Sequence, residues 1–273
     1  MDTQVDSVRI PTRVGPLNVR QVGSGPVALL WHSLFIDSTS WQRVQPHLAR
    51  HRRLVLIDGP GHGPSGDPGH RYDMEDCAAA AGEVMDALDV TGKVDWLGNA
   101  WGGHVGIVAA TNQPRRVRSL ITLGTPVRAY RPSERRQVRL LSLAYRILGP
   151  AKFLTDGVAD VQLSAATRAH DHEAVAHTTD FLRNADRRQL YNAIQSISLG
   201  REDLNPRLSK IDVPTMFVTG SDHAGFTPDE AHAAIAKVPG GRVEVVADAA
   251  YLIPLEQPVR TADLILDFWR GVA

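Results

Sequence analysis

A group of glycines around Ala100 is the part of the sequence whose residue types and spacing point most directly to chemistry. Residues 98–103 read GNAWGG and lie between an apolar run and a helical pattern. Glycines at these places allow a very sharp turn, because a side chain there would collide with the backbone. Such a turn lifts residue 100 to the top of a sheet and points a helix N-terminus at it, as in a nucleophile elbow. Position 100 is alanine, however, and a methyl group cannot attack a carbonyl.

Four further motifs accompany this turn. His32 and Ser33 follow an apolar run, residues 58–65 read DGPGHGPS, residues 214–222 read PTMFVTGSD, and residues 248–258 read DAAYLIPLEQP. In this order, the five motifs resemble the α/β-hydrolase fold family over nearly the whole chain. The resemblance is to members that carry a lid, such as esterases, epoxide hydrolases and haloalkane dehalogenases.

The catalytic positions that the resemblance implies are mostly replaced. The family's chain order is nucleophile, acid, histidine. Here Ala100 stands at the nucleophile position and Tyr251 at the histidine position, while either Asp222 or His223 occupies the acid position. Loss of the nucleophile or of the base lowers the rate of a Ser-His-Asp hydrolase by several orders of magnitude. We therefore do not expect ordinary esterase or lipase chemistry, and two replacements argue against a single engineered Ser→Ala trap.

The binding apparatus of the family is predicted to remain. The resemblance implies an oxyanion hole made by the backbone N–H groups of Leu34 and Trp101. His32 and Ser33 form the loop beside it, with His32 in a structural role, and Trp41 and Trp101 contribute aromatic walls. An apolar, aromatic pocket predicts a hydrophobic small molecule as ligand, with a carbonyl or enolate oxygen.

These features favour a non-hydrolytic enzyme that catalyses proton transfer, cyclisation or elimination. Tyr251 would orient or protonate a substrate oxygen, or His223, whose imidazole ordinarily titrates near pH 6.5, would act as a general base. One alternative is an inert ligand sensor or binding module, in which Tyr251 only fills the space of a lost histidine. Another is a hydrolase with relocated groups, such as Ser33 or a water activated by His223.

The surrounding elements form an α/β pattern. Short apolar runs alternate with helical patterns, which predicts a mostly parallel eight-stranded sheet with helices on both faces. The first two runs are too close for a crossover and predict an antiparallel hairpin. The predicted strands span residues 5–10, 17–22, 27–31, 54–58, 94–98, 120–124, 215–219 and 242–246. The predicted helices span residues 40–50, 75–88, 101–111, 228–238 and 262–269.

The alternation stops in the middle of the chain. Residues 127–210 are helical and rich in Arg, Ala and Leu. We interpret this segment as a helical cap inserted into a core domain made of residues 1–126 and 211–273. In open α/β sheets the ligand lies outside the carboxyl ends of the strands, so a cap there would shape the pocket and exclude water.

Composition excludes several other classes. The 273 residues are 43% hydrophobic, and 30 basic residues balance 30 acidic ones, so no overall charge favours nucleic acid or a membrane as partner. The single cysteine, Cys77, excludes an internal disulfide and a multi-cysteine zinc site. No metal motif, dinucleotide fingerprint or Walker loop is present, and we expect no cofactor. Without a signal-peptide pattern, a cytoplasmic location is the default expectation, and the oligomeric state is not indicated.

Overall fold

The sheet of the computed structural model runs through the middle of the molecule. The structure describes residues 6–272, so Val5 of the first predicted strand lies outside it. The strands are β1 (Asp6–Ile10), β2 (Leu17–Val22), β3 (Val27–Trp31), β4 (Arg53–Ile57), β5 (Val94–Asn99), β6 (Val117–Leu123), β7 (Thr215–Gly220) and β8 (Arg242–Val246). Their order is β1-β2-β4-β3-β5-β6-β7-β8. The predicted hairpin of β1 and β2 is confirmed. The β2–β4 pair is also antiparallel, and the other neighbours pair in parallel.

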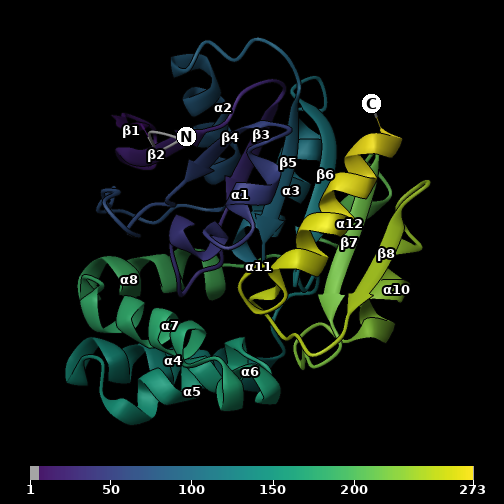
Figure 1. Cartoon of the computed structure of the whole chain (residues 1–273). Coiled ribbons are helices and arrows are strands. Elements are labelled where there is room, and N and C mark those ends of the chain that lie inside the picture. The colour runs from purple at the N-terminus through teal and green to yellow at the C-terminus, as the bar shows by residue number, and fades with distance from the viewer. Residues whose placement is uncertain (1–5, 273) are drawn as a thin grey trace.

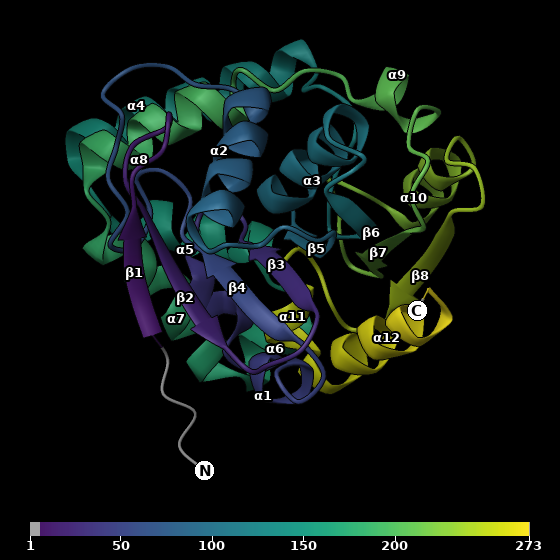
Figure 2. The same ribbon diagram turned by 90° about the horizontal axis from the view of Figure 1, so that it is seen from above.

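Helices cover both faces of this sheet, as predicted. Figure 2 shows α2 (Met74–Ala87), α3 (Trp101–Asn112) and α10 (Pro228–Ile235) on one face, with α1 (Gln45–Leu48) and α12 (Pro258–Gly271) on the other. Neighbouring strand residues belong to different cores, because successive side chains point to opposite faces. Leu29 and Trp96 join the core beneath α2 and α3, whereas Leu30 and Leu97 join the core beneath α1 and α12.

The helix predicted over residues 40–50 is wrong. The structure has two short pieces there, η1 (Ser38–Trp41) and α1. Pro46 lies in the first turn of α1, and its missing N–H and its ring prevent a helix from continuing through from the preceding turn. The Asp37 side chain accepts a hydrogen bond from the Thr39 N–H and caps η1.

A separate layer of helices lies at the end of the sheet where the arrows of β7 and β8 terminate (Figure 1). It contains α4 (Pro132–Leu148), α5 (Lys152–Gln162), α6 (Ala165–His170), α7 (His172–Asn184), α8 (Arg187–Ala193) and the π-helical turn η2 (Ile194–Ser198). This layer corresponds to the proposed cap. The short helix α9 (Asn205–Leu208) falls within the proposed cap segment but packs on α3 and α10 of the core.

Polar contacts join the cap to the core. Where the chain leaves and re-enters the core, the Leu204 N–H donates to the Val127 carbonyl at 2.8 Å. Arg43 donates to Asp171 and Glu173 at the start of α7 and to the Leu255 carbonyl.

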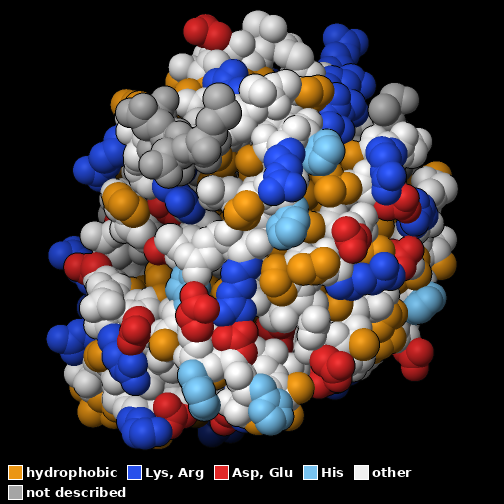
Figure 3. All heavy atoms as spheres, in the orientation of Figure 1, with side chains coloured by type: hydrophobic (Ala, Val, Ile, Leu, Met, Phe, Trp, Pro, Cys, Tyr) orange, Lys and Arg blue, Asp and Glu red, His pale blue; other side chains and the backbone are white. Residues whose placement is uncertain are grey.

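The surface carries both signs of charge interspersed, as the face in Figure 3 shows, in agreement with the balanced composition. Within residues 6–272, no helix has the length and apolar character that crossing a bilayer requires.

Candidate active site

The turn between β5 and α3 holds Ala100 in a strained conformation, with φ of 47° and ψ of −100°. A residue with a Cβ atom rarely adopts such a positive φ. The turn requires glycine at two positions, because a side chain there would collide with the backbone. A Cβ on Gly98 would lie 2.1 Å from the Gly102 carbonyl group, and one on Gly102 would lie 2.0 Å from the Trp31 carbonyl oxygen. The sharp turn predicted from the glycines is therefore present, although it carries a methyl group.

The two tryptophans predicted to line the pocket have buried rings. Trp101 is the first residue of α3, so its backbone N–H has no acceptor within the helix. Its indole packs against Trp31, His32 and His62, with ring centroids 5.1–5.5 Å apart. The Trp41 ring is fully buried in the core beneath α1 and α12. Trp101 thus presents its backbone at the elbow, while both indoles contribute core packing.

The loop after β3 is held by two histidines. The His32 Nε2 atom accepts from the Gly59 N–H at 2.8 Å, so the ring proton is on Nδ1 and is donated to the Ser33 carbonyl at 2.6 Å. The Ser33 carbonyl and the Leu34 N–H belong to one planar peptide and point in opposite directions. His62 Nε2 contacts the Leu34 carbonyl. Burial lowers the pKa of both histidines to about 4, so both rings are neutral near pH 7.

A histidine lies directly against Tyr251, the residue that the resemblance places at the histidine position. The rings of His223 and Tyr251 are 4.1 Å apart at an angle of 37°. His223 Nδ1 accepts from the Gly225 N–H at 3.1 Å and from the Phe226 N–H at 2.9 Å, and Nε2 faces the Gly124 carbonyl at 3.3 Å. Burial lowers the pKa of His223 to about 4. The ring is therefore neutral, and both of its nitrogens face backbone partners.

Tyr251 is tied to both the elbow and the cap through its backbone. Its carbonyl accepts from Asn99 Nδ2 at 2.9 Å, and its N–H donates to the Gln162 carbonyl at 3.1 Å. Burial raises the pKa of Tyr251 well above 10, so the phenol keeps its proton at neutral pH. Asp222 is exposed and accepts a hydrogen bond from the Ser221 hydroxyl. Of the two candidates for the acid position, His223 is the one that contacts Tyr251.

Arg201 also lies beside Tyr251, although nothing in the sequence distinguished it from the other arginines. The residue is 8% exposed, and its guanidinium lies over the Tyr130 ring at 4.2 Å. Contact with Arg201 opposes the effect of burial on the Tyr251 pKa. Burial lowers the pKa of His104 to about 3, and the Arg201 charge adds to this effect. His104 Nε2 donates to the Pro126 carbonyl at 2.8 Å, a structural role.

A cleft of about 670 Å³ lies between the cap and the core. Its lining includes Asp37, Thr39, His177 and Phe181. Thr39 Oγ1 contacts both Asp37 Oδ1 and His177 Nε2, the latter at 2.7 Å. Phe181 stacks on His62 with 5.5 Å between centroids, so the cleft adjoins the loop that carries Leu34. In the described part of the chain, no three His, Cys, Asp or Glu side chains converge in a way that could hold a metal ion.

Comparisons with known proteins agree with this architecture. A 2-hydroxy-6-oxononadienedioate/2-hydroxy-6-oxononatrienedioate hydrolase from Cupriavidus pinatubonensis is 27% identical over 256 residues, which cover 90% of this chain and 84% of that enzyme. A 2-hydroxy-6-oxo-2,4-heptadienoate hydrolase from Pseudomonas putida is 30% identical over 176 residues. That match covers 58% of this chain and less than two thirds, 62%, of the relative.

Solved structures share the fold over almost the full chain. A thermophilic esterase from Thermogutta terrifontis superimposes with a TM-score of 0.88 at 25% identity, covering 98% of this chain and 99% of the esterase. An enol-lactonase from Burkholderia xenovorans gives a TM-score of 0.88 at 22% identity, covering 96% and 100%, which shows the fold alone. The family model for the alpha/beta hydrolase fold matches residues 26–258. This chain is therefore a member of the alpha/beta hydrolase fold family.

Proposed function

We propose that this protein is a non-hydrolytic enzyme that binds a hydrophobic carbonyl compound and catalyses proton transfer, cyclisation or elimination. The observation that carries the proposal is the chemistry of Tyr251. Its phenol stays protonated, because burial raises its pKa, and it stands where the family has its histidine. In the proposed step the proton on the carbon next to the carbonyl passes to water, while Tyr251 donates its own proton, or a hydrogen bond, to the substrate oxygen on which charge develops. His223 supports the phenol by ring packing.

The elbow supplies the second part of the proposed mechanism. The N–H groups of Trp101 and Leu34 stabilise a developing enolate, as an oxyanion hole does. Two features support this role. The Trp101 N–H lies at the N-terminus of α3, where the helix dipole also favours negative charge. The Leu34 N–H points away from His32, because the carbonyl of the same peptide is bound to that ring.

The neighbouring histidines argue against relocated hydrolysis. A hydrolase of the Ser-His-Asp type requires an imidazole that accepts a proton near neutral pH. The pKa of His32, of His62 and of His223 is lowered to about 4 by burial, and each of these rings contacts backbone groups. The names of the relatives combine hydroxy and oxo groups on one carbon chain, which supports an enolisable carbonyl substrate for this member.

Deuterium exchange tests the proposal without knowledge of the natural substrate. Hydrophobic enolisable ketones, such as 2-tetralone and 4-phenyl-2-butanone, are incubated with the protein in D₂O, and exchange next to the carbonyl is followed by NMR. We expect accelerated exchange that falls about 100-fold or more in Tyr251→Phe. Tyr191→Phe is the matched control, because Tyr191 lies in the cap and stacks on Arg146.

Two outcomes would contradict the proposal. Exchange that is equally fast in Tyr251→Phe and in the unaltered protein would remove Tyr251 from the mechanism. Release of p-nitrophenol from a series of p-nitrophenyl esters, lost in Ser33→Ala or His223→Ala, would identify a relocated hydrolase. Native mass spectrometry of the purified protein adds the mass of any retained ligand, and an unreacted ligand with no exchange activity would indicate a binding module.

A further inference from the structure

We propose that Arg201, beside Tyr130 and Tyr251, binds a carboxylate of the ligand, so that the ligand carries a carboxylate in addition to its carbonyl group. The inference deepens the proposed function and rests on it, because it takes the ligand to bind beside Tyr251. Recognition of the carboxylate is nevertheless a property of binding, and it can be measured whether or not the protein catalyses a reaction.

Arg201 carries a buried charge that the described residues do not balance. The residue is 8% exposed, and its Nε atom is buried without a hydrogen-bond partner. Across residues 6–272, the ion pairs of the chain leave Arg201 without an acidic partner. Buried arginines are almost always paired, because removing a charge from water is unfavourable unless an opposite charge or hydrogen bonds compensate. The missing partner fits an anionic group of a ligand.

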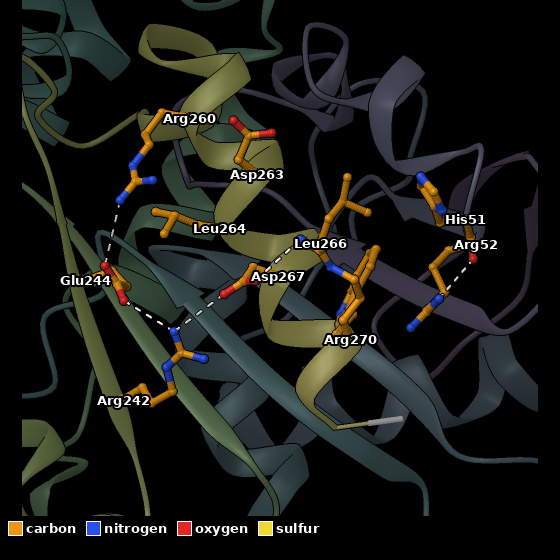
Figure 4. Close-up of a pocket in the computed structure, with 11 residues that line it drawn as sticks. His51, Arg52, Arg242, Glu244, Arg260, Asp263, Leu264, Leu266, Asp267 and Arg270 are labelled. Atoms are coloured by element: carbon orange, nitrogen blue, oxygen red, sulfur yellow. Dashed lines mark hydrogen bonds and ion pairs between the residues drawn. The ribbon is translucent and has the colours of Figure 1, made fainter.

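Other arginines of this chain do have acidic partners. The fully buried Asp95 receives both Arg52 and Arg118. Figure 4 shows the same balance in a surface groove of about 610 Å³ beside α12, where Arg242 and Arg260 pair with Glu244. That groove is balanced by its own side chains, whereas Arg201 is more deeply buried than these arginines and has no such partner.

The surroundings of Arg201 place it at the candidate active site. Its guanidinium is stacked on the Tyr130 ring, close to the Tyr251 phenol, and near enough to His104 to affect the pKa of that ring. Tyr251 is joined through its carbonyl to Asn99, the residue before Ala100. Arg201 and the elbow therefore share one cluster of side chains.

Arg201 lies just after an unusual stretch of backbone. It follows the π-helical turn η2, in which the Leu199 N–H donates to the Ile194 carbonyl at 2.9 Å. Such turns are rare and frequently occur at functional sites. Gly200 has no room for a side chain, since a Cβ there would lie 2.2 Å from the Ser196 carbonyl oxygen.

A carboxylate is the anion that suits this geometry. The planar guanidinium offers a fork of N–H donors that matches two carboxylate oxygens, and its unpartnered Nε is one arm of that fork. Phosphate carries more charge and is commonly held by several cations or backbone N–H groups. The neighbouring Arg128 is already engaged by Glu134, with N···O distances of 2.7 and 2.8 Å. A single guanidinium that contacts two tyrosines and has no acidic partner among the described residues therefore favours a singly charged carboxylate.

Matched acids and amides test the proposal directly. Binding of benzoate, 4-phenylbutanoate and 6-phenylhexanoate is measured by calorimetry and compared with that of the corresponding amides. We expect at least one acid to bind tenfold or more tightly than its amide. This preference disappears in Arg201→Gln and is partly kept in Arg201→Lys. Arg146→Gln is the control, because Arg146 also stacks on a tyrosine, at 4.7 Å, but is exposed on the cap.

Thermal unfolding separates a binding role from a structural one. An unpaired buried charge destabilises the ligand-free protein, so Arg201→Met is expected to unfold at a higher temperature than the unaltered protein. A lower unfolding temperature would show that Arg201 is a structural brace and would overturn the proposal. Equal affinity for acids and amides, an acid preference that persists in Arg201→Gln, or competition by inorganic phosphate as strong as that by the acids would also overturn it.

The two proposals fail in different ways. Loss of the acid preference in Arg201→Gln supports the carboxylate site even if no ketone exchanges deuterium. Conversely, exchange that depends on Tyr251 supports the proposed function even if acids and amides bind equally.

Discussion

The rings of His223 and Tyr251 lie 4.1 Å apart; the family resemblance implies a histidine at position 251, and His223 is one of the two candidates for the acid position. An acid and a histidine in those places would exchange a hydrogen bond and keep the imidazole basic. Here the imidazole faces backbone groups through both nitrogens, and the phenol is left to contact Arg201. Under the proposed function, the pair offers a proton donor at the position where we expect a hydrolase to carry its proton acceptor.

Restoring the nucleophile alone should not restore hydrolysis. Ala100→Ser places a hydroxyl on the elbow, but burial lowers the pKa of His32, His62 and His223 to about 4, so these rings are poor bases. We expect its turnover of p-nitrophenyl acetate to stay within tenfold of the unaltered protein. Ala100→Ser/Tyr251→His supplies both groups and should exceed the single variant by at least about tenfold, since nucleophile and base act as a unit. Substantial activity in Ala100→Ser alone would show that another base is present.

Two identical Gly→Ala changes should have opposite effects on stability. In Gly102→Ala the new Cβ would meet the Trp31 carbonyl oxygen at 2.0 Å, so the free energy of unfolding should fall by about 3 kcal/mol or more. Gly157 lies in the interior of α5, where a Cβ would meet no other atom within 4 Å, so Gly157→Ala should raise it by about 0.5–1 kcal/mol. Urea unfolding measures both, and a stable Gly102→Ala would contradict the tight elbow.

Stability should fall in mild acid because several histidines are buried in neutral form. The pKa is lowered to about 4 for His32, His62 and His223 and to about 3 for His104. As pH falls from 6.5 towards 4, the unfolded chain binds protons at these rings and the folded chain does not. The free energy of unfolding then decreases, by up to about 1.4 kcal/mol per pH unit for each ring.

Urea unfolding at pH 7 and at pH 5 checks this expectation. His104→Gln removes one buried ring and should reduce the difference between the two pH values. His170→Gln changes an exposed ring and should leave the difference as it is. Equal stability at pH 7 and pH 5 would mean that the rings are protonated in the folded protein.

The contact between Arg43 and the cap should limit cap opening. Arg43 donates to Asp171 and Glu173, and its side chain is 19% exposed. Arg43→Gln should weaken cap attachment by about 1 kcal/mol, or roughly fivefold in the open population. Limited digestion with trypsin, which cuts in the arginine-rich cap, measures this change. Arg183→Gln is the control, because Arg183 pairs with Asp180 within α7. Identical cleavage rates in both variants would show that the Arg43 contacts do not limit cap opening.

The sequence predicted the sheet well, because alternating apolar runs and glycine turns are local signals. The helix predicted over residues 40–50 failed because its apolar spacing continues across Pro46, which breaks the helix. The elbow was predictable because only glycine fits at the tightly packed positions of its turn. Arg201 was not predictable, since its burial depends on Tyr130 and on a π-helical turn, both formed only by tertiary packing. Which of Asp222 and His223 points inward could be learned only from the structure, because residues in a loop follow no helix or strand periodicity that would predict their direction.

The 2.8 Å hydrogen bond between Leu204 and Val127 means that the cap departs from the core and rejoins it at nearly one point. Closing a chain between two such points depends only weakly on the number of residues inserted. We therefore expect the pairing of β6 with β7 to depend little on the length of the insertion. We also expect that a short linker or a different helical segment could occupy the same gap while the sheet and the elbow stay as they are.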